Sequence, residues 1–478
     1  MSTAAYDVVV VGGGGSGLAA AASAASEGAR VIVLEKAARP GGTTALSVGS
    51  ITASGTALQR GAGVDDSPEA HFNDLDLFPR PEGATDNMVL RRLYVENAAD
   101  TVCWLGSLGI VFYGPSPEPP HTRPRLHLAL PHSGAYIHAL NRACRAGGVE
   151  VRLEAAARRL IEESGRVVAV QADTAAGPVT VHARKGVILA SGDYSGGRAM
   201  LQELAGERLA AVSPLNAANM GDGHALARAL GARVVNGALA TPEMRFPVPD
   251  RLNWIRRLPP GRLVGNVVRL AMARLPRALL RPVFAMSMTA NLAPTRKLFD
   301  AGAVLVNRDG LRFTDERDEP VLDLARQAGG CAWIVFDAAI AGRFERWPHF
   351  ISTAPGIAYG YLSDYRRYRP DIFRSAPELG ALARLVGVPG TALARSAAHL
   401  KTAPYFALGP LFGWMMTTDG GLAVSERFEV LRAEAPIPGL YAVGSAGQGG
   451  LLLPGHGQHL GWAFTSGRLC GRIVAKLG

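Results

Sequence analysis

The chain has 478 residues, of which 48% are apolar and 19% charged, a composition typical of a globular protein with several domains or one large domain carrying an insertion. Its net charge of +10 equals the ten Lys and Arg residues of a single stretch, 251–297, which contains no Asp or Glu. No run of 18 apolar residues occurs, no Cys or His cluster has metal-ligand spacing, and the basic stretch lacks the interleaved aromatic residues of nucleic-acid binding proteins. We therefore expect no membrane-spanning helix, no metal and no nucleic acid.

The amino-terminal residues lead directly into a strand near Tyr6, which leaves no room for a signal peptide. The four cysteines are scattered and form no C-x-x-C pair. These two features predict a cytoplasmic protein with reduced thiols.

Residues 6–17, YDVVVVGGGGSG, predict a buried strand, a glycine turn and the start of a helix. Three glycines fit G-x-G-x-x-G, which permits a tight turn, a close approach to a pyrophosphate and close helix packing: Gly12, Gly14 and Gly17. A second strand, 30–34, ends at Glu35, where an acid accepts a hydrogen bond from a ribose hydroxyl. The spacing of all these parts predicts a dinucleotide site.

Further along the chain, the pattern predicts a helix over 133–146 and a buried strand over 185–190 that returns to the same sheet. Between about 241 and 399 the character changes to short strands, many aromatic residues and the basic stretch, which indicates an inserted substrate domain. A helix over 461–476 closes the chain.

The basic stretch predicts an amphipathic helix from Gly261 to Arg281, with a kink at Pro276. Its arginines gather in one arc, opposite Val264, Val267, Val268, Met272, Leu275 and Leu279. Such a helix suits the surface of an anionic bilayer, which would place the protein at the inner face of the cell membrane. It is equally consistent with a solvated helix packed on the protein core.

Several separated stretches resemble the fumarate reductase/succinate dehydrogenase flavoprotein family, in the family's order and over most of the chain. Besides the opening motif they are VILASGDYSGG, NMGDGHALARALGA, GLRFTDE, TTDGGL and IPGLYAVGSAG. The closing stretch, PGHGQHLGWAFTSGRLCG, is most similar to the 3-ketosteroid dehydrogenase branch.

This resemblance implies an α/β fold with a Rossmann-like FAD-binding domain of the glutathione-reductase type, made of residues 1–240 and 401–478, and an inserted α+β substrate (capping) domain, 241–400. It implies non-covalent FAD, because 43–47 lacks the histidine of the covalent branch. The residues expected to hold FAD are Gly12, Gly14, Gly15, Ser16, Gly17, Glu35, Lys36, Gly42, Thr43, Thr44, Ser47, Ala190, Gly192, Gly444, Ser445, Gly457 and Leu460.

The chain also departs from the family at the substrate side. The arginine that donates a proton in fumarate reductases aligns with Pro320, a substrate histidine with Thr417 and a second arginine with Pro454. A dicarboxylate needs such cations, so fumarate and succinate are disfavoured. The two tyrosines of the steroid branch align with Pro320 and Leu453, and only the turn ending at Gly457 remains.

The candidate catalytic groups follow from what removal of hydrogen next to a ketone requires. The resemblance places the Gly457 N–H where it would donate to a substrate carbonyl, and it places His456 and His459 in the turn against the flavin, where either would act as the base. Tyr361, from a cluster of four tyrosines, and Tyr194 are further candidates. Each has a structural alternative: a histidine bonded to backbone, a packed tyrosine or a turn residue.

Three hypotheses follow. The first is an FAD-dependent dehydrogenase that desaturates a lipophilic cyclic ketone of the 3-ketosteroid type and passes electrons to a separate acceptor. The second is an ene-reductase that acts on an activated alkene with an external electron donor. The third is a non-catalytic flavoprotein that docks on membranes through 251–297.

Overall fold

The computed structural model describes residues 4–354 and 358–478. Its main sheet has the order β20-β21-β9-β1-β2-β6, with the antiparallel strands β7 and β8 joined to β9. Four pairings along this order are parallel: β21 with β9, β9 with β1, β1 with β2, and β2 with β6. The strands are β1 (Ala4–Val11), β2 (Val31–Leu34), β6 (Glu150–Arg152), β7 (Ala156–Glu163), β8 (Arg166–Thr174), β9 (Gly177–Leu189), β20 (Glu429–Arg432) and β21 (Ala435–Ala442).

Helices cover this sheet and form the core of the first domain. The helix α1 (Gly15–Ser26) packs against α18 (Gln458–Ala475) and α6 (Gly134–Ala146), and α18 also packs against α5 (Met88–Ser107). The crossing of α1 and α18 is so close that a Cβ at Gly471 would lie 2.2 Å from the Ala20 carbonyl oxygen. The first and last helices of the chain thus pack against each other. The helices predicted over 133–146 and 461–476 are found as α6 and α18.

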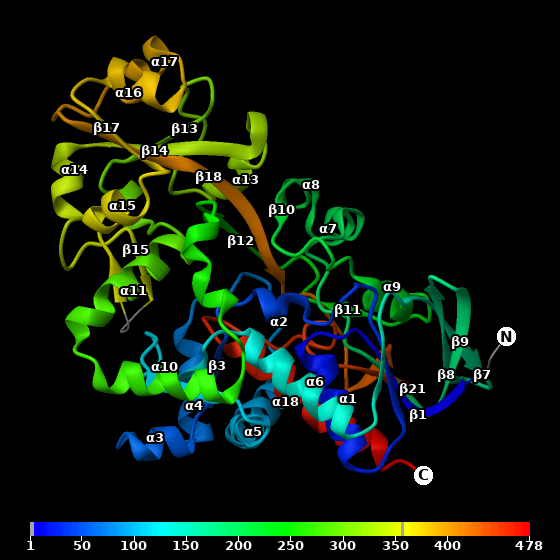
Figure 1. The fold of residues 1–478 in the computed structure, drawn as a ribbon. Coiled ribbons are helices and arrows are strands. Elements are labelled where there is room, and N and C mark those ends of the chain that lie inside the picture. The colour runs from blue at the N-terminus through cyan, green and yellow to red at the C-terminus, as the bar shows by residue number, and fades with distance from the viewer. Residues whose placement is uncertain (1–3, 355–357) are drawn as a thin grey trace.

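A second sheet belongs to the capping domain, with the order β10-β18-β14-β13 and with β12 and β17 also paired to β18. Figure 1 shows it at the upper left, above the first domain, with the long strand β18 running from one domain into the other. Its strands are β10 (Ser213–Pro214), β12 (Ala240–Arg245), β13 (Val304–Val306), β14 (Cys331–Asp337), β17 (Phe373–Ala376) and β18 (Tyr405–Thr418). Its helices include α13 (Pro320–Leu324), α14 (Ala338–Arg343), α15 (Leu362–Tyr368), α16 (Leu379–Val386) and α17 (Gly390–Ser396). The second sheet thus uses strands on both sides of the expected boundaries at 241 and 400.

The basic stretch forms two helices rather than one kinked helix, namely α10 (Arg262–Arg274) and α11 (Arg277–Asn291). They are separated at Leu275 and Pro276, because proline disfavours a helical conformation in the residue before it. We call this pair the α10–α11 hairpin (Figure 1). No helix among the described residues is long and apolar enough to cross a membrane.

The α10–α11 hairpin touches both domains. Its first helix packs on a small sheet of the first domain, and its second helix packs on α15 and a short capping-domain hairpin. These strands are β3 (Ser50–Thr52), β4 (Val111–Ser116) and β5 (Leu126–Leu130) in the small sheet, and β15 (Ser352–Ala354) and β16 (Ala358–Gly360) in the short hairpin. Short elements near the predicted site are α2 (Gly42–Leu46), α4 (Pro68–Asp74), α9 (Asp222–Arg228) and β19 (Gly421–Leu422).

Candidate active site

The glycine turn between β1 and α1 is closely packed on one side and open on the other. A Cβ at Gly17 would lie 1.9 Å from the Gly12 carbonyl oxygen, and a Cβ at Gly12 would lie 2.5 Å from the Ala190 carbonyl oxygen. Gly14, in contrast, has nothing within 4 Å of such a Cβ, and it precedes α1 without a capping side chain. The positive end of a twelve-residue helix is therefore left open to a phosphate.

Glu35 lies at the end of β2, beside this turn. Its Oε2 accepts a hydrogen bond from the Gly13 N–H at 2.7 Å, and its Oε1 accepts one from the Ala37 N–H at 2.8 Å. Each carboxylate oxygen has a second lone pair, so Glu35 retains the capacity to bind a ribose hydroxyl. The neighbouring Lys36 forms an ion pair with Asp222 at the start of α9.

The short helix α2 closes over the same turn. The Gly15 N–H donates to Thr44 Oγ1 at 3.2 Å, and a Cβ at Gly42 would lie 3.3 Å from the Gly14 Cα. Ser47, which ends the helix, donates to the Thr44 carbonyl oxygen. This packing brings the two glycine segments, 12–17 and 41–42, into one cradle.

Thr43 connects α2 to a buried polar network. Its Oγ1 accepts hydrogen bonds from the side-chain amides of Asn216 and Asn219, both at 2.9 Å. Asn219 also donates to Asp193 Oδ1 at 2.9 Å, and Thr417 at the end of β18 donates to Asp193 Oδ2 at 3.0 Å. Asp193 is 2% exposed, and Ser195 donates to it as well. Neutral donors, not a cation, therefore satisfy this buried carboxyl group.

The carboxyl-terminal part of the chain reaches the cradle at Gly444. Its N–H donates to Ser466 Oγ at 3.0 Å, and its carbonyl oxygen accepts from Trp462 Nε1 at 3.1 Å. A Cβ at this position would lie 2.6 Å from Ser16 Oγ in the first turn of α1. Only glycine fits here, and the half-buried Ser445 follows directly.

The turn at 454–457 is held from both sides before α18 begins. The Gly457 carbonyl oxygen accepts from the Thr52 N–H at 3.2 Å, and the His456 carbonyl oxygen accepts from Thr52 Oγ1 at 2.7 Å. The His456 N–H donates to Glu118. The Gly457 residue has φ 81°, and its own N–H donates to no residue that the structure describes. A fixed, free N–H therefore stands at this turn.

Glu118 belongs to a buried polar cluster beneath the turn. It is 5% exposed, its Oε2 has no partner among the described residues, and burial raises its pKa to about 7. Next to it, the Gln458 amide lies 3.3 Å from His71 Nε2 and 3.1 Å from His121 Nε2. Burial lowers the pKa of both histidines, so the two imidazoles beside Gln458 are neutral at neutral pH.

The two candidate histidines differ in their partners. His459 Nε2 lies 3.4 Å from Asp419 Oδ1, so this ring is held by a carboxylate. His456 lies at the surface of the turn, and no described group within hydrogen-bond distance holds its ring. Desolvation lowers the pKa of His456, and the charges of Glu243 and Arg245 act on it in opposite directions. Those two side chains in β12 are bonded to each other at 2.8 Å.

The two candidate tyrosines lie in different surroundings. Tyr194 is fully buried, and its hydroxyl donates to the Gly237 carbonyl oxygen at 2.7 Å, which favours a structural role. Tyr361 precedes α15 in the capping domain, with the Arg281 guanidinium 5.8 Å from its ring centre. Among the described residues, no hydrogen bond, ion pair or ring contact joins Tyr361 to the turn at 454–457.

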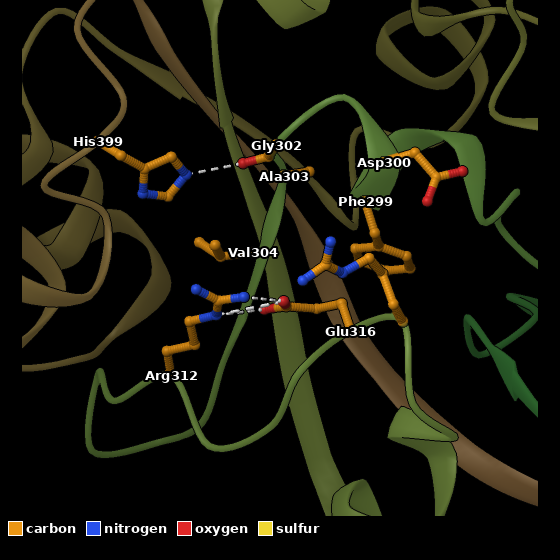
Figure 2. Close-up of a pocket in the computed structure, with 9 residues that line it drawn as sticks. Phe299, Asp300, Gly302, Ala303, Val304, Arg312, Glu316 and His399 are labelled. Atoms are coloured by element: carbon orange, nitrogen blue, oxygen red, sulfur yellow. Dashed lines mark hydrogen bonds and ion pairs between the residues drawn. The ribbon is translucent and has the colours of Figure 1, made fainter.

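A cavity of about 480 Å³ lies elsewhere in the capping domain, around β13 (Figure 2). Arg312 of the GLRF motif points into it and forms an ion pair with Glu316, whose Oε1 also accepts from the Leu305 N–H. His399, on the opposite wall, bonds to the Gly302 carbonyl oxygen. These paired groups give the GLRF motif a structural function, and the cavity contains none of the predicted site residues.

The comparison with known families now decides the class of the site. The model of a family described as an FAD binding domain matches residues 7–248, about half of the chain. The chain belongs to this family. FAD is therefore its cofactor, and the open end of α1, Glu35 and the glycines at 12–17, 41–42 and 444 fit that cofactor.

The relatives of this FAD-binding chain include fumarate reductases and ketosteroid dehydrogenases. A probable fumarate reductase of Shewanella frigidimarina is 26% identical over 464 residues, which cover 94% of this chain and 70% of that protein. The open conformation of a flavocytochrome c3 fumarate reductase superposes with a TM-score of 0.75 at 23% identity, covering 99% of this chain and 78% of the other. The 3-ketosteroid delta1-dehydrogenase of Sterolibacterium denitrificans, in complex with 1,4-androstadiene-3,17-dione, gives 0.69 at 19% identity, covering 99% and 100%. The predicted flavoprotein fold is thus confirmed.

The structure brings predicted FAD residues from four distant parts of the sequence into one cradle, namely 12–17, 35–47, 190–192 and Gly444. Gly457 lies instead at the turn at 454–457 and Leu460 in the first turn of α18, and their contact with FAD stays a prediction. Sequence reasoning missed five polar residues that surround this cradle and its turn: Glu118, Asn219, Glu243, Arg245 and Asp419. Asn219 and Asp419 stand inside stretches that already carry the family resemblance, so the motifs NMGDG and TTDGG contained a signal for them. Nothing local distinguishes the other three.

Proposed function

We propose that this FAD-dependent oxidoreductase desaturates a carbon–carbon bond next to the carbonyl group of a hydrophobic cyclic ketone. The observation that carries the proposal is the free N–H of Gly457, which Thr52 and Glu118 hold in place through hydrogen bonds to the same turn. A preorganised N–H stabilises an oxyanion more than it stabilises the ground-state carbonyl. The Gly457 N–H would therefore favour loss of a proton from the carbon beside the ketone.

The charges near the turn support a neutral substrate. Glu243 and Arg245 form an ion pair, so they bring no net charge to the neighbourhood of His456. Thr417, at the position of a family histidine, is engaged with Asp193. A dicarboxylate would have to lose its hydration without gaining the cations that compensate for it.

We assign the proton transfer to His456. Its lowered pKa keeps the imidazole neutral at neutral pH, which is the form that accepts a proton. His459 is held by Asp419 and positions the first turn of α18. FAD supplies the hydride acceptor when bound, and a separate electron acceptor must then reoxidise it.

The test is anaerobic mixing of the FAD-loaded protein with a panel of 3-ketosteroids and simpler cyclohexanones, followed by flavin absorbance. We expect bleaching by at least one lipophilic ketone and none by succinate. A flavin that stays oxidised with every ketone, or that succinate bleaches, would contradict the proposal. A Gly457→Ala variant is strained at φ 81° and its Cβ would lie 2.8 Å from the Thr52 backbone nitrogen, so the turn and its N–H should shift and the reaction should be lost. The ratio of flavin to protein absorbance shows how much FAD this variant still binds.

The reverse reaction is the second candidate, because the fumarate reductase of Shewanella frigidimarina is similar over 94% of the chain. In that case an external donor would reduce the flavin, and an activated alkene would reoxidise it. Stopped-flow reoxidation of the reduced protein with enones, compared with fumarate, distinguishes the two directions. Reoxidation by enones that is faster than reduction by the corresponding ketones would favour the reductase.

A non-catalytic role is the weakest of the three hypotheses, because the family comparison supports an oxidoreductase. It would be supported if His456→Asn and Gly457→Ala left every flavin reaction unchanged. The docking part of that hypothesis concerns a different surface and does not depend on catalysis.

A further inference from the structure

The α10–α11 hairpin exposes a row of large apolar side chains. Leu263, Val267 and Leu270 are 79%, 61% and 57% exposed, and their i, i+4, i+7 spacing places them along one side of α10. The row continues through the turn with Leu275, 44% exposed, and into α11 with Leu279, 64% exposed. We call these five residues the apolar row. No comparable row of exposed leucine and valine occurs elsewhere in the part of the chain that the structure describes.

The other side of α10 is used for packing. Gly265 is buried, and a Cβ there would lie 2.9 Å from the Leu130 carbonyl oxygen of β5. Val264, Val268 and Met272 are half-buried on the same side. The sequence-based assignment of faces is therefore corrected, because Val267 and Leu279 are exposed while Val264 and Val268 contact the protein. The helix already has its intramolecular contact, and the apolar row remains after it.

Four exposed arginines around the apolar row have no acidic partner within 4 Å among the described residues: Arg257, Arg262, Arg269 and Arg274. Two other arginines of this stretch form ion pairs. Arg251 forms an ion pair with Asp371, and Arg281 forms one with Asp364. The free positive charge is thus concentrated where the apolar side chains are exposed.

We infer that the α10–α11 hairpin docks on the surface of an anionic lipid bilayer. The acyl region of a bilayer accepts leucine and valine side chains, while lipid phosphates neutralise the flanking arginines. Trp254, 40% exposed just before α10, has the amphipathic ring that is enriched at membrane interfaces. An anionic bilayer would bury the apolar row and neutralise the unpaired arginines at the same time. This inference goes beyond the proposed reaction and does not depend on it.

The docking surface is connected to the flavin cradle. The Arg256 guanidinium donates to the carbonyl oxygens of Leu46 at 2.7 Å and Ala45 at 3.2 Å, at the end of α2. Leu46 and the nearby Val48 are themselves 41% and 55% exposed. The apolar exposure therefore extends to the helix that carries Thr43 and Thr44, so docking would bring the cradle close to the lipid surface.

The experiment is co-sedimentation of the FAD-loaded protein with phosphatidylcholine vesicles that contain phosphatidylglycerol, compared with vesicles of phosphatidylcholine alone. We expect binding to the anionic vesicles that weakens as salt is raised. The double variant Leu263→Asn/Leu270→Asn should weaken binding at least tenfold, and Arg262→Gln/Arg269→Gln by roughly fivefold for each arginine. All four positions are exposed, so flavin absorbance and thermal unfolding should be unchanged.

Matched controls are available on α16 of the capping domain, where Leu385 is 52% exposed and Arg384 is also exposed. Leu385→Asn and Arg384→Gln should leave vesicle binding unchanged. Quenching of Trp254 fluorescence by brominated lipids, lost in Trp254→Phe, would place this residue in the interface.

Two outcomes would overturn the inference. The first is a failure of vesicle binding to behave as expected: the wild-type protein does not sediment with anionic vesicles at low salt, or both double variants bind these vesicles as well as the wild type does. The other is self-association, measured by sedimentation velocity, that Leu263→Asn/Leu270→Asn abolishes while vesicles have no effect. The occupant of the apolar row would then be a second copy of the chain.

Discussion

The two ends of the flavin cradle are built in different ways. At the phosphate end, glycines at 12, 17 and 444 bring backbone segments so close that any side chain would overlap a carbonyl group or a hydroxyl group. At the end where we propose that substrate binds, the turn at 454–457 is held by side chains that come from β3 and from Glu118, hundreds of residues earlier in the sequence. The backbone conformation of the phosphate end is therefore fixed by close packing that excludes side chains. The conformation of the turn is fixed by hydrogen bonds from residues that are distant in the sequence. Substitutions should therefore have different effects at the two ends.

The largest effect is expected at Gly17. In Gly17→Ala the new Cβ would overlap the Gly12 carbonyl oxygen, so α1 could not pack on β1 and folding should fail. Gly14→Ala meets no atom of the protein, so it should fold but bind FAD weakly, because its methyl group enters the space of the phosphates. Circular dichroism and the ratio of flavin to protein absorbance check both. Equal FAD content in the two variants would show that the phosphate end is less constrained than its geometry indicates.

The second effect concerns the base. His456→Asn should lower kcat by roughly 10²–10⁴-fold, the range expected for loss of a general base. His459→Asn is the matched comparison, and it should lower kcat by less than about tenfold because Asp419 already engages that ring. In the wild type, kcat should fall as pH decreases through the lowered pKa of His456, since the protonated ring cannot accept a proton. If kcat falls more in His459→Asn than in His456→Asn, then His459 and not His456 is the base.

The third effect is on stability against pH. Burial raises the pKa of Glu118 to about 7 from an ordinary value of 4.5, so its neutral form is favoured in the folded state. Its contribution is fully present below about pH 4.5 and is lost as pH rises through about 7, a change on the order of 3 kcal/mol. Glu118→Gln should remove this dependence. Denaturant unfolding at several pH values measures it, with the exposed Glu426→Gln as control. Parallel pH curves for wild type and Glu118→Gln would contradict the prediction.

The smallest effect is expected at the ribose end. Glu35→Gln retains one acceptor oxygen but loses the charge, so FAD affinity should fall about tenfold, which corresponds to about 1.4 kcal/mol. Fluorescence titration of the apoprotein with FAD measures this change. Lys36→Gln, at the next residue, serves as a control. The ammonium group of Lys36 pairs with Asp222, so we expect its loss to lower FAD affinity less than Glu35→Gln does. Equal affinity in wild type and Glu35→Gln would remove Glu35 from the cofactor site.

The same contrast explains what could be predicted from the sequence. The phosphate end could be predicted because its glycines follow one another in a short motif of fixed spacing. The family resemblance added Gly444, which lies far from this motif in the sequence. The surroundings of the turn could not, because Glu118 and Glu243 have no local pattern and gain their role only when distant strands pair. The faces of α10 were partly misjudged, since a helical projection shows which residues share a side but not which side meets the protein.

The strand β18 gives the two domains a mechanical connection. Its first residues pair with β14 and β17 deep in the capping domain, and at its other end Thr417 bonds to Asp193 while Asp419, just beyond it, contacts His459. Fourteen extended residues span about 46 Å and stretch very little. If the capping domain tilted relative to the first domain, β18 would transmit the movement and displace Thr417 and Asp419 at the flavin cradle. Closure over a substrate and adjustment of the polar network around Asp193 would then be a single movement.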